Sequence, residues 1–200
     1  MRPIPDPLQA VIEQLARLGL GPKAALRAGM ALLKWPEGET RRLGESIFNL
    51  HSRLAPCSRC GALTDQDPCP ICRDAGRDGA LLCVVAEWDS LLTLEQGAFY
   101  RGYYLVLGGV LAPLDNLRPE NLALKELEQR LAEGEVSELI LALGATLEAE
   151  NTASYIRERL GAKFPKVRIT RLAQGIPLGA EVKFMDSETL RQSMKYRQDI

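Results

Sequence analysis

Four of the five cysteines in this 200-residue sequence fall into two Cys-x2-Cys pairs, which are separated by eight residues. These four cysteines are Cys57, Cys60, Cys69 and Cys72. A two-residue gap lets both thiolates of a pair face one ion, and four sulfurs complete the tetrahedral shell that zinc prefers. Such a shell leaves no position for water, so we expect one structural rather than catalytic zinc. An iron–sulfur cluster or a redox dithiol pair is the alternative, but pairs this close together favour a single small ion.

The segment 56–78 around these cysteines is rich in Cys, Pro, Gly and Asp and shows little periodicity. It is too poor in apolar residues to fold alone, so we expect the metal to organise it. Its three arginines are matched by four aspartates, which is a poor balance for binding phosphate. We therefore expect the zinc to act as a joint between neighbouring modules and not to read nucleic acid.

The fifth cysteine and the single histidine are expected to lie outside the metal shell. Cys83 sits inside an apolar run, where a small buried hydrophobe is the simplest interpretation. His51 lies just before the cysteine pairs, and it could be a ligand only if one cysteine were not. We interpret His51 as an ordinary helix-end residue.

A second candidate site is the turn Gly19-Leu20-Gly21-Pro22, which Lys23 and Arg27 follow. Glycines permit close approach of the backbone, and proline is favoured at the start of a helix. Free N–H groups at that helix start can bind a phosphate, and side chains four residues apart project from one helix face. This pattern is typical of DNA binding without sequence specificity. The alternative is a helical hairpin with a solvated basic face.

Apolar periodicity predicts the elements that must position these residues. Helical spacing is found over 8–18, 23–33 and 42–54, and the first two segments with their glycine turn form a helix–hairpin–helix unit. From residue 80 onward, short apolar runs alternate with helical patterns, which favours a mostly parallel sheet covered on both faces. The expected strands are 81–86, 103–107, 138–143 and 167–172, with helices over 90–96, 120–133 and 151–161. A possible strand at 182–185 and a short helix from Ser187 complete the chain.

Composition and charge limit the class of protein. The sequence is 46% hydrophobic, enough for a real core, but it has no apolar run long enough to span a membrane. The N-terminus lacks the apolar stretch of a secretory signal, so we expect a cytoplasmic protein with free thiols. Residues 1–60 carry nine Lys/Arg against five Asp/Glu, and the remainder is acidic. A basic N-terminal segment favours an anionic partner.

Several short motifs, taken in this order, resemble the RecR family of bacterial recombination mediators over essentially the whole chain. They are residues 19–27, the cysteine spacing with Pro70-Ile71 inside it, Cys83-Val84-Val85, Val106-Leu107-Gly108-Gly109, Pro113-Leu114-Asp115, Arg171-Leu172-Ala173, Gly175-Ile176-Pro177-Leu178-Gly179, and Asp186 with Thr189-Leu190. The resemblance implies an α/β chain with four parts: a helix–hairpin–helix DNA-binding module (1–55), a four-cysteine zinc finger (56–78), a Toprim-like domain (79–175) and a C-terminal oligomerisation or packing segment (176–200).

The resemblance also implies a function. RecR-like proteins act in RecF-pathway DNA repair, where with RecO and RecF they promote loading of RecA on single-stranded gaps. They bind single- and double-stranded DNA and form dimeric or tetrameric rings. The family's DNA-contacting lysine and arginine fall on Lys23 and Arg27 of this sequence.

The sequence departs from Toprim enzymes at the positions that would hold Mg²⁺. Ala86 replaces the usual glutamate after the first strand, with Glu87 one residue late, and Gly144 and Thr146 occupy the two aspartate positions of the later signature. Of the acidic residues around this later signature, only the downstream pair Glu148 and Glu150 is present. We expect both to lie in a loop before a helix that starts at residue 151. We expect this pair to meet a partner surface such as RecO rather than to catalyse a reaction.

Three functions remain open. The first is a non-enzymatic DNA-binding mediator, the second a Toprim-type metal-dependent nicking enzyme, and the third a protein–protein adaptor. Missing carboxylates argue against the second, and the third differs from the first only if DNA binding is absent.

Overall fold

The computed structural model describes residues 4–197. The chain divides into two compact units, Met1–Leu54 and Ala55–Ile200. Within the described residues, no helix is both long and apolar enough to cross a membrane.

The first unit begins with a helical hairpin. Helix α1 (Asp6–Arg17) packs against helix α2 (Pro22–Leu32), and Gly29 of α2 lies against α1. A Cβ atom at Gly29 would stand 3.2 Å from Leu8 and 3.4 Å from Ile12, so the small residue allows the helices to approach closely. This hairpin agrees with the two helices expected over 8–18 and 23–33.

The third helical stretch differs from the expected 42–54. Helix α3 (Glu37–Phe48) begins five residues earlier, and a separate short helix α4 (Leu50–Arg53) follows it. Pro36 precedes the first turn and two glutamates lie in it, both of which favour an early helix start. Asn49 separates the two helices, and its side-chain amide donates to the carbonyl of Glu45.

The second unit opens with the cysteine-rich segment. Strands β1 (Ala55–Pro56) and β2 (Leu63–Thr64) pair antiparallel, and the short helix α5 (Pro70–Arg73) carries the second cysteine pair into the same small body. The sequence analysis did not predict these short elements, because two-residue strands leave no periodic pattern.

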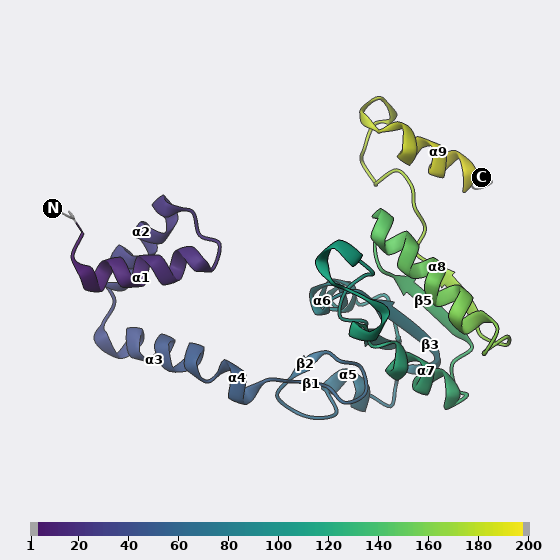
Figure 1. Ribbon diagram of the computed structural model, residues 1–200, viewed down its shortest axis with the longest axis horizontal. Helices are drawn as coiled ribbons and strands as arrows, with labels where there is room; N and C mark the ends of the chain where they lie inside the picture. Colours follow the sequence, from purple (N-terminus) through teal and green to yellow (C-terminus); the bar gives the residue numbers. More distant parts are fainter. Residues whose placement is uncertain (1–3, 198–200) are drawn as a thin grey trace. The chain divides into compact units, whose positions relative to one another are not determined.

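A four-stranded sheet forms the centre of the second unit (Figure 1). Its strands are β3 (Asp78–Val85), β4 (Gly102–Val106), β5 (Glu138–Ala142) and β6 (Arg168–Arg171), in the order β4-β3-β5-β6. Every neighbouring pair in this sheet is parallel, which confirms the predicted parallel architecture. Strands β4 and β6 are therefore its two edges.

Successive residues of β3 point to opposite faces of the sheet, and each face has its own buried cluster. Leu82 and Val84 pack with apolar residues of helices α7 (Leu124–Ala132) and α8 (Leu147–Gly161). Cys83 and Val85 pack with Leu91 of helix α6 (Trp88–Gln96) and with the four cysteines of the finger. The finger and helix α6 thus cover one face of the sheet, and helices α7 and α8 cover the other.

Three local expectations were wrong. The segment 120–133 is helical only over α7, after the 3-10 turns η1 (Pro113–Asp115) and η2 (Pro119–Asn121). Helix α8 begins at Leu147, not at residue 151, because the hydroxyl of Thr146 accepts a hydrogen bond from the N–H of Ala149 and caps the helix. The expected strand over 182–185 is instead the 3-10 turn η3 (Val182–Phe184).

The chain ends with helix α9 (Ser187–Lys195), as expected for a helix from Ser187 (Figure 1). Asp186 caps it by accepting a hydrogen bond from the N–H of Thr189 at 2.8 Å. A hydrogen bond from the Thr189 hydroxyl, together with this backbone bond, lowers the pKa of the Asp186 carboxyl.

Candidate functional site: a cysteine metal centre and a basic helix start

The four paired cysteines converge on one point. Their sulfur atoms all lie within 4.8 Å of one another, and the Sγ atoms of Cys60 and Cys69 are 3.6 Å apart. Zinc–sulfur bonds of about 2.3 Å in a tetrahedron place the sulfurs about 3.8 Å apart, so the cluster fits a zinc ion. The N–H of Cys69 also donates to the sulfur of Cys57 at 3.3 Å, as expected around a metal-bound thiolate.

The electrostatics of the cluster favour the same conclusion. A hydrogen bond from the Cys72 thiol is the main reason that the pKa of Cys60 is lowered to about 6. The same bond, together with burial and neighbouring charge, raises the pKa of Cys72, and burial raises that of Cys69 to about 11. Like charges in one buried site oppose each other's ionisation, and a divalent cation removes that opposition. Cys57, Cys60, Cys69 and Cys72 are therefore the ligands of a structural zinc, which holds the finger in shape.

Cys83 and His51 lie where the sequence placed them. Cys83 is 3% exposed in strand β3, and burial raises the pKa of its thiol to about 12, so it behaves as a buried hydrophobe. His51 is exposed in helix α4 and is not part of the cysteine cluster.

The finger is attached to the sheet through the backbone. The N–H of Val106 in strand β4 donates to the carbonyl of Cys60 at 2.8 Å. Gly61 has φ +73°, and a Cβ there would stand 3.3 Å from the Val106 carbonyl oxygen, so glycine serves both the turn and the close approach. The zinc ligands and the edge strand β4 are thus parts of one packed body.

Arg77 reinforces this attachment. Its side chain is only 6% exposed and forms ion pairs with Glu95 of α6 and Asp74 of the finger. Its Nη1 atom also donates to the carbonyl of Gly102 at 3.1 Å, and the guanidinium lies 6.0 Å from the ring centre of Tyr104. One buried cation therefore joins the finger, helix α6 and strand β4. Sequence reasoning counted Arg77 only as one of the three arginines of the segment 56–78, because nothing in its local pattern signals burial.

The candidate DNA-binding residues lie at the start of helix α2. Gly19 has φ +89°, a conformation that glycine adopts without strain, and Gly21 caps the helix with no side-chain hydrogen bond. Lys23 lies in the first turn, where no acidic residue is present, and Arg27 lies one turn later. Both side chains are exposed. The helix start thus combines free N–H groups with two cations on one face.

These two cations are free to bind an external anion. Within the described part of the first unit, the ion pairs are Arg41 with Glu37 and Arg42 with Glu39, both on helix α3. Neither Lys23 nor Arg27 takes part in them.

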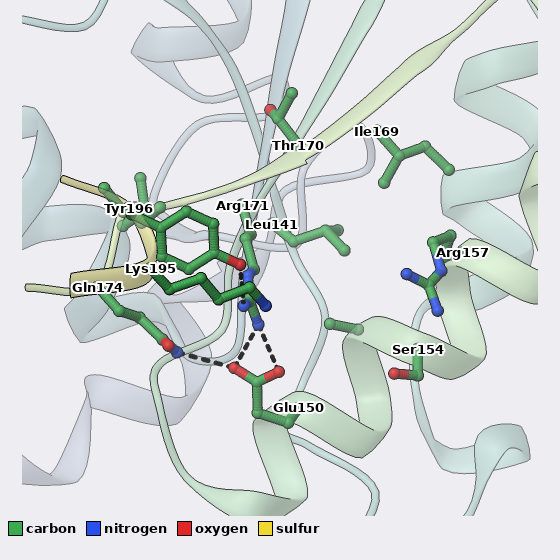
Figure 2. Close-up of a pocket in the computed structure, with 13 residues that line it drawn as sticks. Leu141, Glu150, Ser154, Arg157, Ile169, Thr170, Arg171, Gln174, Lys195 and Tyr196 are labelled. Atoms are coloured by element: carbon green, nitrogen blue, oxygen red, sulfur yellow. Dashed lines mark hydrogen bonds and ion pairs between the residues drawn. The ribbon is translucent and has the colours of Figure 1, made fainter. Parts of the chain in front are cut away.

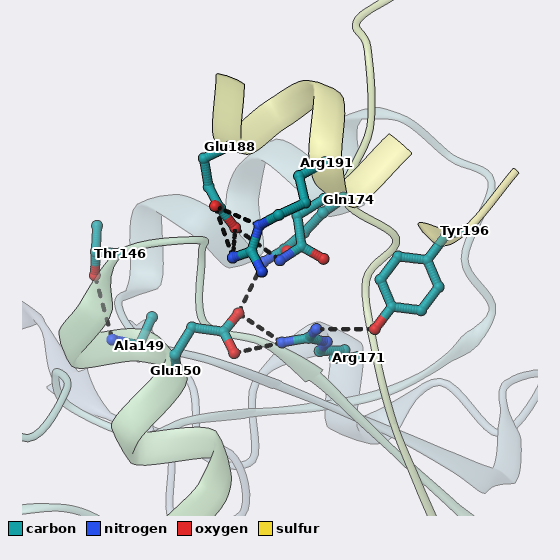
Figure 3. Close-up of polar contacts among 9 residues, drawn as sticks. Thr146, Ala149, Glu150, Arg171, Gln174, Glu188, Arg191 and Tyr196 are labelled. Atoms are coloured by element: carbon teal, nitrogen blue, oxygen red, sulfur yellow. Dashed lines mark hydrogen bonds and ion pairs between the residues drawn. The ribbon is translucent and has the colours of Figure 1, made fainter. Parts of the chain in front are cut away.

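The two acidic residues proposed to meet a partner have different surroundings, and Figures 2 and 3 show those of Glu150. Both lie in the first turn of helix α8 and not in a loop, which corrects the expectation from sequence. Glu148 is exposed. Glu150 accepts hydrogen bonds from Arg171 at 2.6 Å and from the side-chain amide of Gln174 at 2.8 Å. The carboxylate of Glu150 is therefore already engaged within the chain.

Arg171 extends this contact to the C-terminal segment. Its Nη2 atom donates to the hydroxyl of Tyr196 at 3.3 Å (Figure 3). This bond is the main reason that the pKa of the Tyr196 phenol lies below its ordinary value. The chain Glu150–Arg171–Tyr196 joins helix α8, strand β6 and the end of helix α9. Sequence reasoning missed it because its members are up to 46 positions apart.

Among the described residues, no group of carboxylates converges at the positions that hold Mg²⁺ in Toprim enzymes. Glu87 caps helix α6 at the end of strand β3, and Thr146 caps helix α8 after strand β5. Within residues 4–197, the four cysteines are the one group of three or more Cys, His, Asp or Glu side chains that converges on a point.

Comparison with known proteins agrees with this architecture. The sequence profile of the Toprim domain matches residues 80–173, that of the RecR four-cysteine zinc finger domain matches residues 54–74, and that of the RecR C-terminal region matches residues 175–198. The chain is 64% identical to the recombination protein RecR of Nitratidesulfovibrio vulgaris and 52% identical to that of Maridesulfovibrio salexigens, in both cases over 100% of each chain. It is 42% identical to RecR of Moorella thermoacetica over 98% of each chain. A zinc finger packed on a Toprim-type sheet, with relatives this similar along their whole length, means that the chain belongs to the RecR family of recombination proteins.

Proposed function

We propose that this chain is a non-enzymatic, DNA-binding recombination mediator that acts in the cytoplasm in RecF-pathway repair. In this proposal it works with RecO and RecF and promotes RecA loading on single-stranded gaps. A role in DNA recombination follows from the relatives, each of which is named a recombination protein. The observation that carries DNA binding is the start of helix α2, where Lys23 and Arg27 are exposed beside an uncapped helix terminus.

The module 1–55 would contact phosphates through the helix start and its two cations, and phosphates are present at every DNA sequence alike. DNA binding is then independent of sequence and weakens as salt rises, since each phosphate contact releases a counterion. In this view the finger (56–78) shapes the protein and does not bind DNA. Of its two exposed arginines, Arg59 is paired with Glu133 of the same unit, and Arg73 donates to the side chain of Gln66.

A ring of two or four copies is part of the proposal. The first unit leaves many apolar side chains exposed, and helix α3 buries none of its residues. Phe48 is 83% exposed and Leu33 is 68% exposed. Apolar surface at this density marks a contact with another chain, and a second copy supplies a matching surface. The C-terminal segment 176–200 also exposes Leu178 and Phe184, which supports a second contact there.

The test of the DNA site is the double variant Lys23→Ala/Arg27→Ala. We expect its affinity for mixed-sequence single- and double-stranded oligonucleotides to fall by about tenfold or more, equally for all sequences. The slope of log K against log salt, measured by fluorescence anisotropy, should fall in magnitude by about two.

The matched control is Arg101→Ala/Lys125→Ala, which removes two exposed cations from the second unit. Its DNA affinity and salt slope should stay close to those of the unmodified protein. Unchanged DNA affinity in the first variant would overturn the assignment of Lys23 and Arg27.

The ring is tested by light scattering with and without DNA and RecO. We expect a dimer or tetramer, and Phe48→Glu should dissociate it because a buried charge without a partner is costly. A monomer under every condition would contradict the ring.

The alternative function is a Toprim-type nicking enzyme. The residues that favour this alternative are Glu148 and Glu150, which lie two positions apart in the first turn of helix α8. Magnesium-dependent nicking of supercoiled plasmid that is lost in Glu148→Ala would support this alternative against the mediator.

A further inference from the structure

A groove runs along strand β6, at one edge of the Toprim sheet (Figure 2). Its volume is about 730 Å³. Helix α8 forms one wall and the end of helix α9 the other, and β6 itself lies between them. The proposed DNA-binding function assigns no role to this groove.

The edge of β6 has backbone groups that no other strand uses. The N–H groups of Arg168 and Leu172 donate to the carbonyls of Ser137 and Leu141 in and before strand β5. Because the direction of backbone groups alternates along a strand, the N–H and C=O groups of Ile169 and Arg171 point away from β5. Within residues 4–197, no strand lies beyond β6 in the sheet.

The side chains of the groove form an apolar floor between cations. Leu141 and Ile169 lie on the floor. Arg157 of helix α8 stands on one side, with Lys195 and Tyr196 on the other (Figure 2). Lys195 lies 5.0 Å from the ring centre of Tyr196, and neither Lys195 nor Arg157 forms an ion pair within the described residues.

One acidic side chain also lines the groove. Glu150 lies at its end, but the ion pair with Arg171 and the hydrogen bond from Gln174 neutralise and occupy its carboxylate. The charge presented to a ligand is therefore set by Arg157 and Lys195, and it is positive.

We propose that this groove binds an extended acidic segment of a partner protein, which adds to β6 as a fifth strand. The segment would pair its backbone with Ile169 and Arg171, place an apolar side chain beside Ile169, and direct carboxylates toward Arg157 and Lys195. Strand addition to an open sheet edge is a recurring mode of peptide recognition, in which the main chain supplies affinity and the pockets supply specificity.

The geometry favours a peptide over a nucleic acid. Two outward-facing pairs of N–H and C=O groups match the donors and acceptors of an extended polypeptide, whereas a phosphate backbone offers only acceptors. The floor is apolar and suits an aliphatic side chain more than a ribose. The groove also shares no residue with the helix start that carries Lys23 and Arg27, so its occupancy and DNA binding can be measured independently.

The probe is a fluorescein-labelled ten-residue peptide in which valine alternates with glutamate and aspartate. We expect full-length protein to bind it at micromolar concentration and Arg157→Glu/Lys195→Glu to bind it at least tenfold more weakly. The matched control, Arg101→Glu/Lys125→Glu, reverses two exposed cations outside the groove and should bind the probe as the unmodified protein does. DNA affinity should be retained in Arg157→Glu/Lys195→Glu if the two sites are separate.

Two further measurements test strand addition itself. Hydrogen exchange at the amides of Ile169 and Arg171 should slow by about tenfold when the probe binds, while exchange of the Lys125 amide stays unchanged. Two further probes, one N-methylated at the valines and the other at the acidic residues, each lack every second N–H, and one of the two should bind at least tenfold more weakly.

Several results would overturn the proposal. They are the absence of probe binding at 1 mM, equal binding by the charge-reversed variant, equal binding of both N-methylated probes, and unchanged exchange at both amides. Displacement of the probe by inorganic phosphate or by a single-stranded 12-mer, at constant ionic strength, would assign the groove to a small anion or to nucleic acid instead.

Discussion

The backbone N–H of Val106 donates a hydrogen bond to the carbonyl of Cys60 over 2.8 Å, so a residue of the sheet and a zinc ligand hold each other in place. Val106 ends the edge strand β4, which pairs with a single neighbour, β3. An edge strand has fewer backbone hydrogen bonds than a central one, and the finger provides an additional contact on that side. The order of the finger and the order of β4 are therefore coupled.

Zinc removal tests this coupling. We expect Cys60→Ser, or treatment with a strong chelator, to lower Tm by on the order of 10 °C, because metal binding supplies much of the finger's folding free energy. Hydrogen exchange should accelerate in β4 more than in β5, which is paired on both sides. Cys83→Ser is the control: it removes a thiol from the same core and should leave zinc content at one ion per chain. Equal acceleration in β4 and β5 would mean that the finger stabilises the sheet as a whole.

Arg77 should contribute strongly to the same junction. Arg77→Ala removes a nearly buried cation and leaves Glu95 without its main partner, so we expect a loss of about 3 kcal/mol in the free energy of unfolding. Urea denaturation measures this loss. Arg101→Ala, at an exposed position whose backbone carbonyl accepts the N–H of Asp78, should change the free energy by less than about 0.5 kcal/mol. Similar losses of unfolding free energy in the two variants would contradict a stabilising role of Arg77 between the finger and the sheet.

The glycine turn before helix α2 provides a matched pair of variants, with alanine at residue 19 or at residue 21. A Cβ at Gly19 or Gly21 meets no atom within 4 Å, so neither alanine would clash with a neighbour. Gly19→Ala places alanine at φ +89° and should cost about 1 kcal/mol, whereas Gly21→Ala, at φ −60° in the N-cap position of helix α2, should cost less. Thermal unfolding gives the stabilities, and DNA anisotropy should show weaker binding for Gly19→Ala alone. Equal affinities would show that the turn does not position the cations.

Glu148 and Glu150 should separate into two roles. Glu150→Ala removes the partner of Arg171 and Gln174, so we expect faster hydrogen exchange in helix α9 with a stability change below about 1 kcal/mol, because the pair is partly exposed. Glu148→Ala should leave α9 unchanged and weaken binding to RecO in a pull-down titration. The division of roles is wrong if Glu148→Ala also speeds hydrogen exchange in helix α9, or if Glu150→Ala does not.

The sequence by itself determined the four-cysteine zinc site and the parallel sheet. Cys57, Cys60, Cys69 and Cys72 could be identified because ligand spacing is local, and a metal needs only the right atoms at the right intervals. The parallel sheet was predictable for a similar reason, since buried strands appear as continuous apolar runs between helical patterns. The basic start of helix α2 was visible in the turn residues and in the four-residue spacing of its cations.

The tertiary structure decided those features that depend on contacts between residues far apart in the sequence. Sequence placed Glu148 and Glu150 together in a loop, but the cap at Thr146 put them in a helix, and Arg171 engaged only the second. Burial of Arg77 and the open edge of β6 likewise depend on which strands lie side by side. Local patterns determine which residues can bind or pair, whereas the packing of distant segments determines which of them remain free to do so.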